Sequence, residues 1–170
     1  MFRAIMALMR FLPQALIISV LFYLAYLFIK ENKGQAALKL KALIKNDYKF
    51  AVFVFYTVLM LTSTIFARGF TNPFTHLIGY FTYDGWGNFN YVGLLNILMF
   101  IPYTFLYIIA FTPDKPFQKG LIFTVTTTLF IELYQLLFWV GQFSLADIIH
   151  NTIGGIIGIG LWFAKKRLYK

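Results

Sequence analysis

Cysteine is absent from this 170-residue chain, and charged residues make up only 12% of it. Without cysteine there is no disulfide framework, no thiolate metal site and no thiol nucleophile. A typical soluble domain is about 25% charged and roughly 45–50% apolar, whereas 60% of this chain is hydrophobic. A globule of this size cannot hide that much apolar surface from water. The composition therefore predicts an integral membrane protein.

Motifs of known chemistry are missing as well. The sequence has no His-Glu-x-x-His, no Gly-x-Ser-x-Gly, no Walker loop and no cluster of metal ligands. It holds three serines, and none has a histidine nearby in the sequence. We therefore expect no metal and no cofactor, and no motif identifies a reaction.

Five apolar runs are long enough to cross a bilayer, which takes about 20 residues and at least about 17. Only the fourth run contains a charged residue, Glu132. The first run lacks a small-x-small cleavage site, so we interpret it as a retained helix rather than a signal peptide. We expect an all-α fold, a polytopic bundle of five transmembrane helices. The runs are Phe11–Ile29, Phe50–Phe66, Tyr91–Phe111, Leu121–Val140 and Ile148–Ala164.

The basic residues between these runs predict the orientation in the membrane. Five spans place twelve of them on one side and three on the other, and the richer side is cytoplasmic by the positive-inside rule. We therefore expect a multi-pass protein of the bacterial cell membrane with its N-terminus outside and its C-terminus in the cytoplasm. The twelve are Lys30, Lys33, Lys39, Lys41, Lys45, Lys49, Lys115, Lys119, Lys165, Lys166, Arg167 and Lys170, and the three are Arg3, Arg10 and Arg68.

Two connections between the runs have a marked composition. The lysine-rich connection 30–49 predicts a short helix on the anionic inner leaflet. Because its lysines flank a membrane helix, we expect no nucleic-acid partner. The connection 67–90 is rich in aromatic residues and glycine, which fits either an aromatic belt at the outer interface or a lid over a site below it.

Glu132 is the most informative residue of the sequence. It lies eleven positions after Leu121, about 17 Å into a hydrocarbon core of about 30 Å, so we expect it near the midplane and facing the bundle interior. Thr124, Thr128 and Gln135 share its helix face at spacings of three and four. Glu132 either joins helices by hydrogen bonds or serves a function, and the cost of a midplane acid favours function.

The last run begins with a helix-capping pattern. Ser144 is the expected N-cap, and Asp147 lies near the positive end of the helix dipole. Asn151, Gly154 and Gly158 continue the face of Asp147 at spacings of four, three and four. The two glycines form a Gly-x-x-x-Gly contact that lets another helix approach closely. His150 lies one position off this face, as an interfacial residue rather than a ligand.

Polar residues from four segments fall in the predicted outer half of the membrane. Arg68 follows the second run, and we expect its side chain either to snorkel to the interface or to pair with Glu132 or Asp147. We predict one outward-opening polar pocket that binds a headgroup, a peptide or a sugar. As an alternative, Glu132 and Asp147 are candidate catalytic residues for acid–base chemistry. The predicted ligand-binding residues are Arg68, Asn72, Asn96, Glu132, Gln135, Asp147 and Asn151.

Three blocks of the sequence resemble the VanZ family of bacterial membrane proteins. The first is residues 56–74, a helix ending in Arg68 before Thr-Asn-Pro-Phe; the second is Asn96 to Pro102; the third is residues 131–155, with the pattern Glu-x-x-Gln, Asp, Asn-x-x-Gly-Gly. The resemblance covers about 50–160. It divides the chain into an N-terminal helix with the lysine-rich segment, 1–49, and a VanZ-like four-helix membrane domain, 50–170.

The sequence departs from the family pattern at three places. Thr104 stands where glycine is usual, Gln142 where arginine is usual, and Ala146 or Ser144 where another acid is common. An ion pair between that arginine and that acid would be missing from this chain. The effect of these departures is left open.

The VanZ resemblance implies a link to teicoplanin resistance. It favours a non-enzymatic envelope protein that binds a lipid-tailed glycopeptide, or its lipid-linked cell-wall target, at the outer leaflet. The alternatives are an enzyme that modifies a lipid-linked precursor and, ranked last, a transporter subunit, because five helices are few and no inverted repeat is visible. The expected partners are a membrane lipid or lipid-linked precursor and the glycopeptide itself. The sequence does not indicate an oligomeric state.

Overall fold

The computed structural model describes residues 2–31, 47–66 and 91–168, and over these ranges the chain is helical and contains no strand. The second described stretch begins as an α-helix and continues without a break as a short π-helix. The elements are α1 (Phe2–Glu31), α3 (Asp47–Leu61), η1 (Thr62–Phe66), α4 (Tyr91–Phe111), α5 (Pro116–Phe138) and α6 (Leu145–Leu168).

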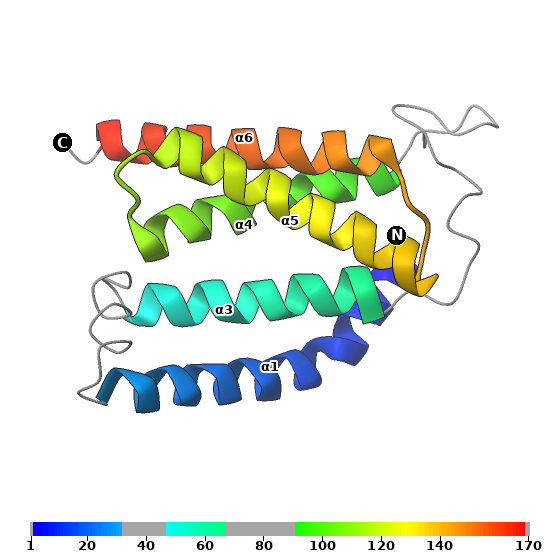
Figure 1. Ribbon diagram of the computed structural model, residues 1–170, viewed down its shortest axis with the longest axis horizontal. Helices are drawn as coiled ribbons and strands as arrows, with labels where there is room; N and C mark the ends of the chain where they lie inside the picture. Colours follow the sequence, from blue (N-terminus) through cyan, green and yellow to red (C-terminus); the bar gives the residue numbers. More distant parts are fainter. Residues whose placement is uncertain (1, 32–46, 67–90, 169–170) are drawn as a thin grey trace.

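The helices lie side by side along one axis, and the chain reverses direction from each long helix to the next (Figure 1). Helices α1, α4 and α6 therefore run one way, and α3 and α5 run the other way. Helix α3 packs between α1 and α4, while α6 packs against both α4 and α5. This arrangement makes α4 and α6 parallel neighbours, although α5 separates them in the sequence.

The expected helical membrane fold is confirmed for four of the five runs. Four helices of the described chain are long and apolar enough to span a bilayer, namely Tyr48–Ile65, Tyr91–Phe111, Pro116–Phe138 and Leu145–Leu168. Helix α1 contributes a shorter apolar stretch, Ala15–Lys30, within the residues whose placement is described. A fifth span formed by α1 stays a prediction.

The alternating directions gather basic residues at one end of the bundle. This end holds the end of α1, the start of α3, the α4–α5 connection and the end of α6 (Figure 1). The basic residues of these described segments are Lys30, Lys49, Lys115, Lys119, Lys165, Lys166 and Arg167. The orientation in the membrane stays a prediction. Most of the two marked connections, residues 32–46 and 67–90, lies outside the described residues.

Aromatic rings pack between α3, α4 and α5. The ring of Phe53 on α3 lies 5.8 Å from that of Tyr103 and 5.9 Å from that of Phe123, centroid to centroid. The rings of Tyr107 and Phe123 stack at 3.9 Å. Offset and edge-to-face ring pairs attract each other beyond the area they bury, which matters here because lipid tails are as apolar as the side chains they would replace. These rings join α3 to the rest of the bundle.

The ends of α5 depart from the limits of its apolar run. The helix begins five residues before Leu121 because Pro116 stands in its first turn, where the missing N–H costs nothing. It ends when Trp139 adopts a left-handed conformation, with φ of 56°, and Gly141 follows with φ of 80°. This tight turn brings the start of α6 next to the end of α5.

Candidate functional site

Glycine lets α6 lie directly on the backbone of α4. A Cβ atom added at Gly154 would overlap the carbonyl oxygen of Ile97, and one added at Gly158 would overlap that of Ile101. At Gly160 an added Cβ would meet nothing within 4 Å. The predicted contact face is therefore confirmed, and its partner is α4. Each glycine lies 57 positions after the isoleucine that it contacts, and such a constant offset is expected for two parallel helices in register.

Helices α5 and α6 are joined by a ladder of polar contacts. The Asn151 side-chain amide donates to Thr128 Oγ1 at 2.7 Å, and one turn further the Ser144 backbone N–H donates to Glu132 Oε2 at 2.8 Å. In the other direction, Thr124 lies against Gly155. The face that carries Thr124, Thr128 and Glu132 is therefore interior, as the spacing predicts. We call the buried polar residues of these contacts and of the adjoining turn the polar cluster: Thr124, Thr128, Glu132, Gln135, Ser144, Asp147 and Asn151.

Glu132 is 2% exposed, so it faces the interior of the bundle as expected. It stands six residues before the end of α5 at Phe138, which is about 9 Å along the helix axis. Its partner is the backbone N–H of Ser144, the residue before α6 begins. The carboxylate thus lies toward the α5–α6 turn, and its depth in the bilayer stays a prediction.

Ser144 is hydrogen-bonded both to Glu132 on α5 and to the first turn of α6. Its hydroxyl accepts the backbone N–H of Asp147 at 3.2 Å, which confirms its role as the N-cap of α6. Its own backbone N–H donates to the Glu132 carboxylate, so Ser144 links Glu132 on α5 to the first turn of α6. Asp147 is 9% exposed and lies in the first turn of α6, where the helix dipole stabilises a negative charge.

Gln135 links the cluster to the π-helix. Its side-chain amide N–H donates to the backbone carbonyl of Thr64 in η1 at 3.2 Å. Because a carbonyl can only accept, this contact fixes the amide orientation and leaves Gln135 Oε1 buried without a hydrogen-bond partner in the described chain. Asn151 Oδ1 is also buried and without a hydrogen-bond partner there. Buried polar atoms are normally paired, so both oxygens can accept from a further donor.

The π-helix is a part of the site that sequence reasoning missed. Thr62 and Thr64 donate their hydroxyls to carbonyls of the preceding turn, those of Val58 and Met60. The only signal in the sequence is the run Thr-Ser-Thr at 62–64, where short hydroxyl side chains bond back to the backbone. Single-turn π-helices are rare and frequently occur at functional sites.

Asn96 and His150 complete the description of the predicted residues. Asn96 is 6% exposed on α4. The His150 ring packs onto Gly93, where an added Cβ would overlap it, so an interfacial role fits. Five of the seven predicted ligand-binding residues are thus buried on α4, α5 and α6, while Arg68 and Asn72 lie outside the described residues. A ligand-binding role for all seven stays a prediction.

Of the departures from the family pattern, the one at Thr104 has a structural account. Thr104 donates to or accepts from Thr124 across the α4–α5 contact at 2.7 Å, so its hydroxyl adds a bond that glycine cannot make. Ala146 is fully buried at the start of α6.

For metal binding, no group of three or more His, Asp or Glu side chains comes together in the described parts of the chain.

The fold and the polar cluster define a class of protein. Four helices that are long and apolar enough to span a bilayer, with acids and amides buried between them, are typical of multi-pass helical membrane proteins. Within this class, the chain belongs to the VanZ/LLP1 family, whose model matches residues 15–166. The match begins further toward the N-terminus than the motifs do and includes most of α1.

A curated relative points the same way. The chain is 32% identical over 76 residues to the protein VanZ of Enterococcus faecium, which covers 45% of this chain and 46% of the relative. The chain thus matches less than half the length of that protein. No solved structure matches the chain.

Proposed function

We propose that this chain is a multi-pass protein of the bacterial cell membrane that lowers susceptibility to lipid-tailed glycopeptides of the teicoplanin type. Family membership supports this function, since the family match covers nearly the whole chain and a relative carries the name VanZ. In this proposal α1 is a fifth span, with the N-terminus outside. The gathering of the described basic residues at one end of the bundle supports that orientation.

The proposed binding site is the polar cluster, opening to the outer side. It binds the drug or its lipid-linked target. The observation that carries the proposal is that two acids, Glu132 and Asp147, are buried at the end of the bundle that is opposite the lysines. Intramembrane acids are costly and mark functional sites by default. The unpaired oxygens of Gln135 and Asn151 supply acceptors for the hydroxyl and amine groups of a polar ligand.

Arg68 and Asn72 belong to this proposal through their place in the sequence. Arg68 follows η1 by two residues, and Gln135 fastens η1 to α5 at Thr64. The chain therefore leaves η1 next to the cluster. A guanidinium there would pair with a carboxylate and hold it ionised.

The test compares charge-removing variants that keep side-chain shape. The teicoplanin inhibitory concentration is measured in cells expressing wild type, Glu132→Gln, Asp147→Asn or Arg68→Gln at matched membrane levels. Gln118→Leu is the control, because Gln118 is exposed on α5 and outside the cluster. We expect wild type and Gln118→Leu to protect, and the three cluster variants to be present in the membrane without protecting.

Two results would contradict the proposal in different ways. If wild type gives no shift, the resistance function is wrong for this chain. If wild type and all three cluster variants protect equally, the function stands and the cluster is structural.

The position of the two acids also supports a second candidate function. Both are buried near the α5–α6 turn, Glu132 on α5 and Asp147 in the first turn of α6, and two acids in one region suit an acid and a base acting on a lipid-linked envelope precursor. Mass spectrometry of lipids extracted from cells distinguishes the two candidates. An enzyme would change the precursor pool in wild type but not in Glu132→Gln cells, whereas a binding protein would leave the pool unchanged.

A further inference from the structure

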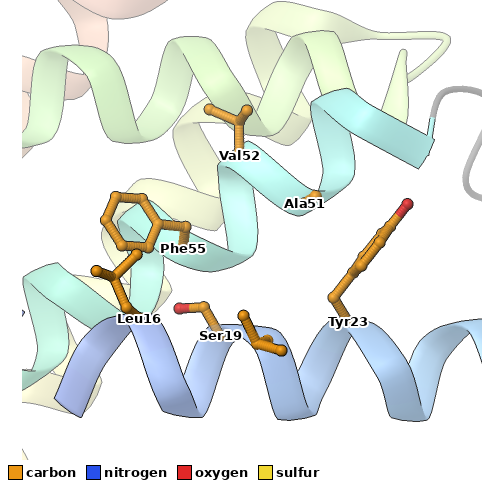
Figure 2. Close-up of a pocket in the computed structure, with 7 residues that line it drawn as sticks. Leu16, Ser19, Tyr23, Ala51, Val52 and Phe55 are labelled. Carbon is orange, nitrogen blue, oxygen red and sulfur yellow. The ribbon is translucent and has the colours of Figure 1, made fainter. Parts of the chain in front are cut away.

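A second recess lies between α1 and α3, away from the polar cluster. It is a groove of about 300 Å³. Leu16, Ser19 and Tyr23 line it from α1, as Figure 2 shows. From α3 it is lined by Ala51, Val52 and Phe55.

The groove has an apolar lining and is open along its length. The Ser19 hydroxyl donates to the carbonyl of Ala15 in its own helix, so it needs no partner in the groove. Ala51 leaves space where a larger residue would fill it. Leu16 and Val52 are each about half exposed, 47% and 48%. Around a membrane helix this exposed surface faces acyl chains rather than water.

Beyond the groove, α1 and α3 are in contact near the ends that carry the lysines. The rings of Tyr26 and Phe50 meet at 4.7 Å between α1 and α3. Lys30 extends over the Tyr26 ring, with Nζ 5.8 Å from the ring centre. Lys49 lies over the ring of Tyr48 at 5.6 Å. Two ammonium groups therefore lie past this ring contact, at the end of the helix pair toward which the groove points.

Charge at this end favours an anion. Lys30 in the last turn of α1 and Lys49 in the first turn of α3 both carry a positive charge at this end of the bundle. Lysines next to a membrane attract anionic lipids. A ligand that matches both features has an apolar chain for the groove and a negative headgroup for the lysines.

We propose that the groove between α1 and α3 binds one acyl chain of an anionic phospholipid, from the leaflet next to the lysine-bearing ends, with its phosphate at Lys30 and Lys49. This site is separate from the polar cluster and does not depend on the function proposed for it. The bound lipid fills the space beside Ala51 and thereby joins α1 to α3.

Native mass spectrometry of the purified full-length protein tests this proposal. The protein in detergent is titrated with dioleoyl phosphatidylglycerol or dioleoyl phosphatidylcholine, two lipids with the same acyl chains. We expect the first phosphatidylglycerol to bind on the order of tenfold more tightly, as two lysines near the membrane surface would give. Equal affinity of the two lipids for wild type would overturn the proposal.

Matched variants separate this groove from general contact with lipid. Ala51→Phe fills the groove, and its control Ala25→Phe adds the same ring on an exposed face of α1. We expect Ala51→Phe to lose the tight phosphatidylglycerol and Ala25→Phe to keep it. Val52→Phe, at the half-exposed rim, replaces Ala51→Phe if that variant does not fold. Retained tight binding in the groove-filling variant would contradict the site.

The headgroup contact has its own pair of variants. The double variant Lys30→Gln, Lys49→Gln should reduce phosphatidylglycerol binding to the level of phosphatidylcholine. The double variant Lys165→Gln, Lys166→Gln removes the same charge at the same end of the bundle but from α6, and should leave the preference intact. If both double variants lose it alike, net charge rather than this site attracts the lipid, and the proposal fails.

Discussion

Helix α1 and the three helices α4, α5 and α6 are held in the bundle by different kinds of contact. The α1–α3 pair meets through aromatic and aliphatic side chains and leaves a groove between them. Helix α6 meets α4 through glycine and backbone, and it meets α5 through hydroxyl, amide and carboxylate groups. In a bilayer, lipid tails compete with apolar contacts but not with close backbone packing or hydrogen bonds. The three-helix group should therefore have the more specific structure, and it is the part that carries the polar cluster.

The largest effect should come from adding bulk between α4 and α6. Gly154→Leu and Gly158→Leu place a side chain on the carbonyls of Ile97 and Ile101, and a backbone obstacle cannot move aside as a side chain can. We expect a loss of more than about 3 kcal/mol, beyond ordinary overpacking, seen as aggregation during purification in detergent. Gly160→Leu should behave like wild type. Equal detergent stability of all three variants would refute this packing face.

One serine in each region provides a smaller test, the N-cap of α6 and a serine inside α1. Ser144→Ala removes the hydroxyl that binds the Asp147 N–H and should cost about 1 kcal/mol, as N-cap substitutions do. Ser19→Ala in α1 removes a hydroxyl that bonds only within its own helix, and should change stability by less than about 0.5 kcal/mol. Thermal unfolding in one detergent measures both variants. A larger loss from Ser19→Ala would reverse the comparison.

The hydroxyl pair between α4 and α5 tests a single polar contact. Thr104→Val keeps the shape of the side chain but removes its bond to Thr124. Hydrogen bonds between membrane helices are worth about 0.6 kcal/mol on average, and we expect a loss of that order. Thr126→Val, on the exposed side of α5, is the control. No difference between the two variants would show that this bond adds nothing to stability.

The smallest effect should come from the exposed α4–α5 connection, where Lys119 pairs with Asp114. The hydrogen bond from Lys119 lowers the pKa of the Asp114 carboxyl below its ordinary value. A lowered pKa in the folded state gives stability above the unfolded pKa of about 3.9 that is lost as the pH falls through the folded value. Asp114→Asn should thus remove a slight pH dependence of unfolding below about pH 4. A clear effect of this substitution at pH 7 would be unexpected, because exposed pairs contribute little.

Local patterns in the sequence predicted a large part of this fold. Four apolar runs became helices of membrane-spanning length, and the three- and four-residue spacings identified the interior faces of α5 and α6. The cap at Ser144 also followed from local sequence, since capping involves residues only three positions apart.

Contacts between distant segments could not be predicted in this way. Nothing local indicates that Gly154 lies on Ile97 or that Gln135 binds Thr64, because each pair is brought together by the packing of whole helices. The start of α5 could not be predicted from hydropathy, because the apolar run begins at Leu121 whereas Pro116 starts the helix. The groove at Ala51 has no sequence signal, since it arises from the distance between α1 and α3.

The central claim is that the polar cluster binds the glycopeptide or its target, while the rest of the bundle supports it. The most direct test is the binding of fluorescently labelled teicoplanin to the purified protein in nanodiscs, with and without the lipid-linked cell-wall precursor. We expect saturable binding to wild type and to Gln118→Leu in at least one of these conditions. Glu132→Gln should unfold at the same temperature as wild type but bind at least tenfold more weakly. Equal binding by wild type and Glu132→Gln would contradict the account.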